Sequence, residues 1–458
     1  MKNILKVRDD HSPITFESNN GSSEEYSVCS DSPKPTWVTD GSFTVNDLRN
    51  RIEPWLTSLF QSEHLSLLIG SGLSTGIQYI ASPEKASNNG MGKPELKEDC
   101  PYAEKIHVAA AKSALNNGRG NEGNIEDYFR VMNDLMCGLE IIGEQEAHQK
   151  LRTEYNDLLN KFVAGISAGE SCIITSDEKK RIDTFNILTT FLMSFSSRTG
   201  TRDRLNIFTT NYDRVIEAGA EISGLHLIDR FVGNLSPIFR SSRLDIDMHY
   251  NPPGMRGEPR YLEGVARYTK LHGSIDWIEA NNEIRRIGLP FGATNIESFI
   301  HSPGFSGVDH SKIMIYPNSS KDRETSEYPY VELFRDFAAA LCRPNSTLVI
   351  YGYSFGDDHI NRIIRDMLTI PSTHIVIISY GDEQSRIKNF YADLGRASQV
   401  SLIIGKDLAD IRKLTENFLP KPAIDRTTIR MAELLKQRHG PTSDEPSKPT
   451  YTEGGVEN

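Results

Sequence analysis

The sequence predicts an α/β fold built on a doubly wound, mostly parallel sheet with a large helical insertion. Short apolar runs without period-two alternation recur between amphipathic helices, from Leu205–Thr209 to Val400–Ile404, as expected of parallel strands buried on both faces. A glycine-rich turn follows an earlier run of this kind, and polar motifs follow several later ones. Open α/β sheets bind their ligands at such strand ends.

The same patterns predict the domain boundaries. Residues 1–40 are rich in Ser, Asp, Glu and Pro, and we expect a disordered or partner-binding arm. The sheet domain is expected over residues 41–76 and 201–420, interrupted by a helical insertion over residues 77–200. Residues 421–458 are expected to form a C-terminal helix and a disordered tail.

Most elements follow from hydrophobic periodicity and length. A helix is expected from Ser42, kinked by Pro54, and a strand over His64–Ile69. After the insertion, the expected strands are Leu205–Thr209, Leu225–Ile228, Ile313–Tyr316, Thr347–Tyr351, His374–Ser379 and Val400–Ile404. The expected helices between and after them are Tyr212–Ala220, Tyr330–Leu341, His359–Leu368, Glu383–Leu394 and Asp407–Phe418. Loops and a short hairpin are expected before Thr269–His272.

Composition limits the class of protein. The chain has 458 residues, of which 38% are hydrophobic and 25% charged, and a formal net charge of −11. This acidic balance argues against direct nucleic-acid binding, because such affinity depends on neutralising phosphates. The five cysteines are scattered and never spaced as CxxC, which argues against a disulfide framework and a four-cysteine zinc site and is typical of a reducing compartment. No apolar run is long enough to span a membrane or serve as a signal peptide, so we expect a cytoplasmic protein.

The first motif is the turn GSGLSTG, Gly70–Gly76, directly after a strand. Such a turn can present backbone N–H groups and a helix N-terminus to phosphates. It is not a P-loop, because no Lys-Ser/Thr pair follows, and Thr75 breaks the GxGxxG pattern. An ordinary tight turn is the alternative.

Two further motifs provide an amide, a carboxylate and an imidazole. FTTNYD contains Asn211 and Asp213, and KLHGSIDW contains His272 followed by Gly273. An amide at this place suits a ribose hydroxyl or an attacking water, and a histidine of near-neutral pKa suits a general base. Alternatively, Asn211 or Asp213 caps the next helix.

The fourth motif is YGYSFGDDHI, again a strand, a turn and the start of a helix. Gly352 and Ser354 are candidates for contacts with phosphate or ribose. Asp357 or Asp358 is a candidate helix N-cap. The whole polar set is suited to cleavage of a glycosidic bond, for which the enzyme positions a ribose and a water.

These four motifs, in this order, resemble the sirtuin family. GSGLS looks like its GAGxS, TTNYD like its TQNxD, KLHG like its catalytic HG, and GYSF like its later G-[ST]-S segment. The resemblance covers residues 60–405 and implies a Rossmann-like, sirtuin-like fold, with Asn211 and His272 in catalytic roles. By the same resemblance, NAD would be bound by Gly70, Ser71, Gly72, Ser74, Asp213, Gly352 and Ser354.

The departures from deacetylase sirtuins are equally informative. The chain lacks the two CxxC pairs of their zinc ribbon, so no metal is expected. The helical insertion and its segment NIEDYFR, Asn124–Arg130, are similar to bacterial sirtuin-like NAD hydrolases of antiphage defence, although Asn124, Glu126 and Asp127 are also typical of a helix start. The resemblance implies a homo-oligomer, depletion of NAD in abortive infection, and pairing with a HerA-type hexameric ATPase.

Three functions therefore remain from the sequence. The leading hypothesis is an NAD+ glycohydrolase that releases nicotinamide and ADP-ribose. An ADP-ribosyltransferase or deacylase would use the same site with a protein acceptor. A non-enzymatic sensor of NAD or ADP-ribose would need neither Asn211 nor His272.

Overall fold

The structure is a computed structural model that describes residues 2–421, except 20–24, 39–40, 85, 87–91, 117–119, 199–202, 242–245, 251–259, 281–282, 294–327 and 383–384. Contacts divide the chain into two units, Met1–Pro420 and Lys421–Asn458. The expected strand Ile313–Tyr316 and the expected C-terminal helix and tail lie outside the described residues. The fold below is that of the first unit.

One mixed sheet organises this unit. Its 11 strands have the order β4-β3-β2-β1-β17-β16-β15-β5-β6-β12-β7, and those from β17 to β7 are all parallel. The parallel strands are β5 (His64–Ile69), β6 (Leu205–Thr209), β7 (His226–Ile228), β12 (Val265–Lys270), β15 (Ser346–Tyr351), β16 (His374–Ser379) and β17 (Val400–Ile404). The predicted α/β class with a mostly parallel sheet is confirmed.

The strand order creates a crossover point at β5. From β5 the chain passes to β6 on one side, and it later returns to place β15 on the other side. The register makes four strands end at the same level, because Ile69 pairs with both Thr209 and Tyr351, and Thr209 pairs with Lys270. The four turns that follow these residues must therefore lie side by side.

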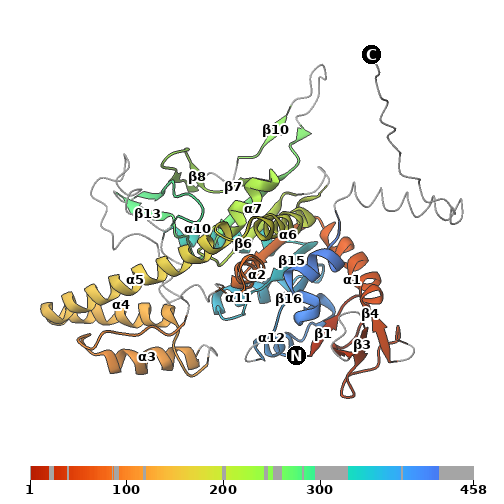
Figure 1. The fold of residues 1–458 in the computed structure, drawn as a ribbon, viewed down its shortest axis with the longest axis horizontal. Coiled ribbons are helices and arrows are strands. Elements are labelled where there is room, and N and C mark those ends of the chain that lie inside the picture. Colours follow the sequence, from red (N-terminus) through yellow and green to blue (C-terminus); the bar gives the residue numbers. More distant parts are fainter. Residues whose placement is uncertain are drawn as a thin grey trace, which may run out of the picture. The chain divides into compact units, whose positions relative to one another are not determined.

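Helices cover both faces of the sheet (Figure 1). Successive strand residues point to opposite faces, so that Leu67 and Ile69 of β5 enter one hydrophobic core and Leu68 enters the other. The first core is covered by α1 (Val45–Phe60), α2 (Ser71–Ala81), α6 (Glu178–Ser196), α7 (Val215–Ser223), α13 (Lys406–Ala409), α14 (Ile411–Lys413) and the π-helix Leu414–Phe418. The second is covered by α10 (Tyr330–Leu341), α11 (Asp358–Met367) and α12 (Arg386–Leu394).

The helical insertion has a core of its own. Helices α3 (Ala103–Asn116), α4 (Ile125–Ile142) and α5 (Gln145–Ile174) pack side by side, and their buried residues form a third cluster that also includes Tyr212. The last helix of the expected insertion, α6, instead packs against α2 and α7 on the sheet. The insertion therefore contacts the chain immediately after β6.

The N-terminal residues differ from the expected disordered arm. Strand β1 (Asn3–Lys6) pairs antiparallel with β17, and β2 (Ile14–Ser18), β3 (Glu25–Val28) and β4 (Ser42–Thr44) extend the sheet. The side chains of Phe16, Tyr26 and Phe43 are buried against one another. These strands form with few apolar residues because only every second side chain of a strand has to face the core. Their pairing also covers the edge of β17, which would otherwise be open.

Pro54 lies inside α1, as expected, and its effect on the backbone is compensated. A proline at this position cannot donate to the carbonyl of Asn50, four residues earlier. The guanidinium of Arg8 donates to that carbonyl at 2.9 Å. The N-terminal segment thus satisfies an acceptor that the helix leaves open.

The short hairpin expected before His272 is confirmed. The strand that follows it, β12, is a parallel member of the main sheet between β6 and β7. A separate four-stranded sheet contains β8 (Phe231–Val232), β9 (Ile238–Phe239), β13 (Trp277–Ala280) and β14 (Glu283–Arg286), and β10 (His249–Tyr250) pairs with β11 (Arg260–Tyr261). In the described part of the chain, no helix has the length and apolar character needed to cross a membrane.

Candidate functional site

A pocket of about 210 Å³ opens where the four turns meet. Six of the nine site residues predicted from the sequence line it: Gly70, Ser71, Asn211, Asp213, His272 and Ser354. The other three, Gly72, Ser74 and Gly352, do not line the pocket and lie behind its wall. The sheet therefore brings together residues separated by up to 284 positions, from Gly70 to Ser354.

The amide of Asn211 has one possible orientation. Its Nδ2 lies 3.0 Å from the carbonyl oxygen of Gly70, and a carbonyl can only accept, so the NH₂ group must face it. The same Nδ2 donates to Ser74 Oγ at 2.9 Å. The Oδ1 atom of Asn211 is then directed away, buried and without a hydrogen-bond partner among the described residues. Asn211 does not cap α7, which was the alternative from the sequence.

His272 offers a second unsatisfied atom in this pocket. The side chain is buried at 5% exposure, and Nε2 has no hydrogen-bond partner in the described structure. The carboxylate of Asp357 lies 4.0 Å from this atom. Buried polar groups are normally hydrogen-bonded, so unsatisfied atoms on both Asn211 and His272 indicate a place for a polar ligand.

Three of the predicted glycines are required by packing between turns. A Cβ atom on Gly70 would lie 2.4 Å from the carbonyl oxygen of Gly352, and one on Gly72 would lie 2.6 Å from the Cα of Gly352. The backbones are also joined, since Gly70 N donates to Tyr351 O at 2.9 Å and Gly72 N to Gly352 O at 3.0 Å. These glycines allow the turns after β5 and β15 to touch, and only Gly70 also borders the pocket.

Positive partial charge is available at one side of the pocket. Gly70 occupies the N-cap position of α2, and Ser71 is the first residue of that helix. Helix N-termini favour anions such as phosphate. The guanidinium of Arg386, which lines the same pocket, adds a full positive charge. This side of the pocket suits a diphosphate.

Acidic side chains also line the pocket. The carboxylate of Glu126, at the start of α4, accepts a hydrogen bond from the Tyr212 hydroxyl at 3.2 Å. Glu122 and Asn124 line the pocket beside Glu126. Asp357 occupies the N-cap position of α11, yet its side chain makes no capping hydrogen bond. Carboxylates here suit a ligand with a cationic ring.

Several of these residues were not predicted as site residues. Asn124 and Asp127 form the capping box of α4, so the helix-start interpretation of NIEDYFR is correct for them. Glu126, in the first turn of the same helix, lines the pocket. Tyr353 and Asp357 belong to a motif that the sequence singled out, whereas Arg386 has no local signal, because only folding brings α12 beside Ser354.

Asp213 combines a structural role with its place at the pocket. Its Oδ1 accepts a hydrogen bond from Val215 N at 3.1 Å at the start of α7, which is a capping role. The next residue, Arg214, is buried and pairs with Glu170 of α5 at 2.5 Å. This pair joins the helical insertion to the turn that contains Asn211.

Burial shifts the pKa of two pocket phenols. Burial raises the pKa of Tyr212 well above its ordinary value, and the nearby carboxylate of Glu126 adds to the shift. Burial likewise raises the pKa of Tyr353, with Asp357 contributing. Both phenols therefore remain protonated near neutral pH and act as hydrogen-bond donors.

The residues that line the pocket fit a nucleotide. NAD needs a site for its diphosphate and polar contacts for its riboses, which the α2 N-terminus, Arg386 and the unsatisfied atoms of Asn211 and His272 provide. Within the described residues, no group of three or more His, Cys, Asp or Glu side chains is placed to hold a metal ion.

Comparison with known families agrees with this geometry. Residues 205–397 match the family model described as SIR2-like domain. The matched segment contains Asn211, Asp213, His272, Gly352 and Ser354, and it begins after the Gly70 turn. No curated protein matches the chain. Residues 205–397 are thus similar to SIR2-like domains, a family that uses NAD and is generally enzymatic.

Proposed function

We propose that this protein is an NAD+ glycohydrolase that converts NAD+ and water to nicotinamide, ADP-ribose and a proton. One observation carries the proposal: Asn211 Oδ1 and His272 Nε2 are both buried and unsatisfied in the same pocket. A site that only binds a nucleotide needs no buried base beside a buried amide. Two acceptors on residues that line one pocket suit the binding and deprotonation of a water or a ribose hydroxyl.

Different residues around the pocket bind the diphosphate, orient the attacking water and accept its proton. The Gly70 turn, the α2 N-terminus and Arg386 hold the diphosphate. Asn211 Oδ1 accepts a hydrogen bond from the attacking water without adding a charge. His272 Nε2 accepts the proton while the water oxygen bonds to C1′ of the ribose and the bond from C1′ to the nicotinamide nitrogen breaks. NAD+ supplies a leaving group whose ring nitrogen is already positive, so no strong acid is required.

The first test is release of nicotinamide and ADP-ribose from NAD+ by the purified full-length chain. Asn211→Ala and His272→Ala should each reduce turnover by about 10²-fold or more, with folding retained. Asn206→Ala and His374→Gln are matched controls, because Asn206 lies on β6 and His374 begins β16, away from the pocket. Both controls should keep wild-type turnover.

The products distinguish the rival functions. ADP-ribose attached to protein would indicate a transferase, and NAD-dependent loss of an acyl group from a protein would indicate a deacylase. NAD binding without turnover, alone or with an added ATPase, would indicate a sensor and contradict the proposal.

The regulation is also a proposal, which rests on the resemblance to bacterial defence hydrolases. We infer that the protein acts as a homo-oligomer with a HerA-type hexameric ATPase, and that its hydrolase activity depletes cellular NAD during phage infection. The acidic net charge of −11 is consistent with a partner that contacts nucleic acid in its place. Measuring NAD in infected cells with wild-type protein or Asn211→Ala tests this role.

A further inference from the structure

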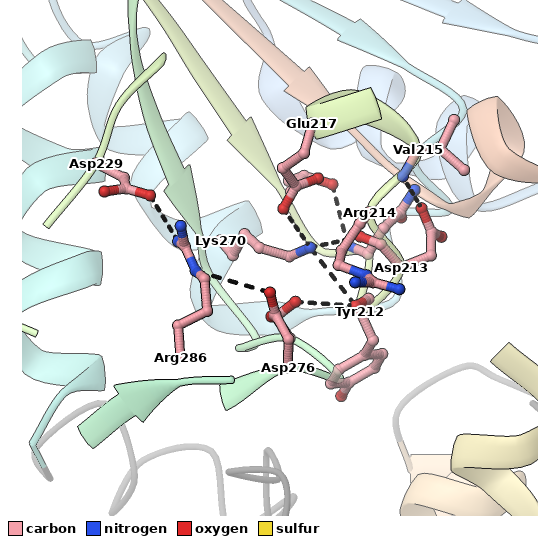
Figure 2. Close-up of polar contacts among 12 residues, drawn as sticks. Tyr212, Asp213, Arg214, Val215, Glu217, Asp229, Lys270, Asp276 and Arg286 are labelled. Atoms are coloured by element: carbon pink, nitrogen blue, oxygen red, sulfur yellow. Dashed lines mark hydrogen bonds and ion pairs between the residues drawn. The ribbon is translucent and has the colours of Figure 1, made fainter. Parts of the chain in front are cut away.

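Lys270, the last residue of β12, is a buried cation that does not itself line the pocket. Only 2% of the residue is exposed. Its Nζ lies 3.0 Å from Glu217 Oε1 and donates to the carbonyl oxygen of Asp213. Figure 2 shows this side chain between Glu217 and the turn formed by Tyr212 and Asp213. Burial of an ammonium group lowers the stability of the fold unless hydrogen-bond acceptors and an opposite charge compensate for the lost water. The contacts of Lys270 with Glu217 and Asp213 provide this compensation.

The contacts of Lys270 connect the two turns that contain Asn211 and His272. Its Nζ is also 3.5 Å from the carbonyl oxygen of Tyr212. That carbonyl accepts two more hydrogen bonds from residues just after His272, namely from Ser274 Oγ at 3.2 Å and from Ile275 N at 3.1 Å. The backbone carbonyls just after Asn211 are thus bound by residues on either side of His272.

Other charges nearby are paired with one another. Arg286 lies 2.6 Å from Asp229 and 3.7 Å from Asp276, and Figure 2 shows these residues beside the Lys270 contacts. Arg214 pairs with Glu170. Of the cations Lys270, Arg214 and Arg286, it is Lys270 that binds the carbonyl of Asp213, in the turn next to Asn211.

We propose that Lys270 is a positioning residue that holds the Asn211 and His272 turns at the separation needed for hydrolysis. This inference rests on the proposed function. A small displacement of reacting groups strongly lowers the rate, whereas the diphosphate contacts at Gly70 and Arg386 lie elsewhere. Loss of Lys270 should therefore lower kcat and leave KM for NAD+ nearly unchanged.

The experiment compares three variants in the full-length protein. Lys270→Met removes the ammonium, and Lys270→Met with Glu217→Gln removes both charges. Arg204→Met is the matched control, because Arg204 is also a mostly buried cation bound to a carboxylate, Asp247 at 3.0 Å, and to backbone carbonyls. It lies next to the opposite end of β6, which begins at Leu205.

We expect Lys270→Met to lower kcat about 10- to 100-fold, with KM within threefold of wild type. Arg204→Met should keep kcat within about twofold. The double variant should regain stability toward urea, because no charge is left unpaired, without regaining kcat. A double variant with restored kcat would mean that Lys270 only compensates the charge of Glu217, and it would overturn the positioning role.

A second readout does not depend on activity. Hydrogen exchange of the Ile275 amide, which donates to Tyr212 O, should be about tenfold faster in Lys270→Met and unchanged in Arg204→Met. If wild-type protein releases no nicotinamide, either alone or with an added ATPase, the proposed function fails, and this exchange rate still tests the link between the turns. Unchanged exchange and unchanged kcat in Lys270→Met would each overturn the inference.

Discussion

Ser74 orients Asn211: the hydroxyl of this α2 residue accepts a hydrogen bond from Asn211 Nδ2 at 2.9 Å. Ser74 is fully buried and does not line the pocket. Together with the carbonyl of Gly70, it binds both N–H groups of the amide. The oxygen of Asn211 is consequently the only part of the amide left for a ligand.

Replacement of Ser74 by alanine tests this arrangement. Asn211 would keep its bond to Gly70 O but could rotate, so we expect kcat to fall about tenfold and the free energy of unfolding to fall by about 1 kcal/mol. Ser66→Ala is the control, because Ser66 is equally buried and its Oγ has no partner among the described residues. Steady-state kinetics and urea titration measure both effects, and equal kcat in the two variants would contradict the orienting role.

Gly352 provides a test of the contact between turns. Its φ of +63° and a hypothetical Cβ at 2.7 Å from Gly72 Cα both oppose a side chain. Gly395 has nearly the same φ, +60°, with nothing within 4 Å of a Cβ. We expect Gly395→Ala to cost about 1 kcal/mol of stability through backbone strain, and Gly352→Ala to cost about 1–3 kcal/mol more and to abolish activity. Thermal unfolding of both variants checks this, and equal losses would show that no steric overlap occurs.

Glu126 provides a test of the acidic residues that line the pocket. Glu126→Gln keeps a hydrogen-bond acceptor for Tyr212 and removes the charge, so the affinity for a cationic ring should fall. We expect KM for NAD+ to rise about threefold to tenfold, in line with the loss of one partly screened charge interaction, while inhibition by ADP-ribose changes less. The exposed Glu146, paired with Lys150 on α5, serves as the control when changed to Gln. An equal rise in KM for both variants would indicate a general charge effect.

His374 makes stability depend on pH. Burial lowers its pKa from 6.5 to about 4, and the charge of Lys6 adds to the shift. As pH falls below 6.5, the imidazole of the unfolded chain binds a proton, whereas that of the folded protein stays neutral until about pH 4. The free energy of unfolding is therefore highest above pH 6.5 and falls on acidification. At pH 5 it should be lower by about 2 kcal/mol.

Urea titrations at pH 7 and pH 5 check this prediction. His374→Gln should lose less stability than wild type between these values, because glutamine retains a hydrogen-bonding group near Ser401 without titrating. The exposed His226, changed to Gln, should behave like wild type. A His374→Gln variant with the same pH dependence as wild type would contradict the assignment.

The fold class was determined by local pattern. Buried runs such as Leu205–Thr209, Tyr330–Leu341 and Val400–Ile404 were predicted at the observed residues, because period and length report burial directly. The N-terminal strands were missed, since Leu5, Phe16 and Tyr26 are spread among polar residues and become a core only when β1 pairs with β17.

For the candidate site, the sequence by itself supplied the four motifs, because each polar residue follows a strand that is readable from its own neighbours. Only the tertiary structure decided which of these side chains contact one another. Because Ile69, Thr209, Lys270 and Tyr351 are in register across the sheet, the turns that follow them are adjacent, and Ser74 can bind the amide of Asn211. Contacts such as those of Arg386 at the pocket, or of Lys270 with the Tyr212 turn, join residues far apart in the chain, and no local pattern encodes them.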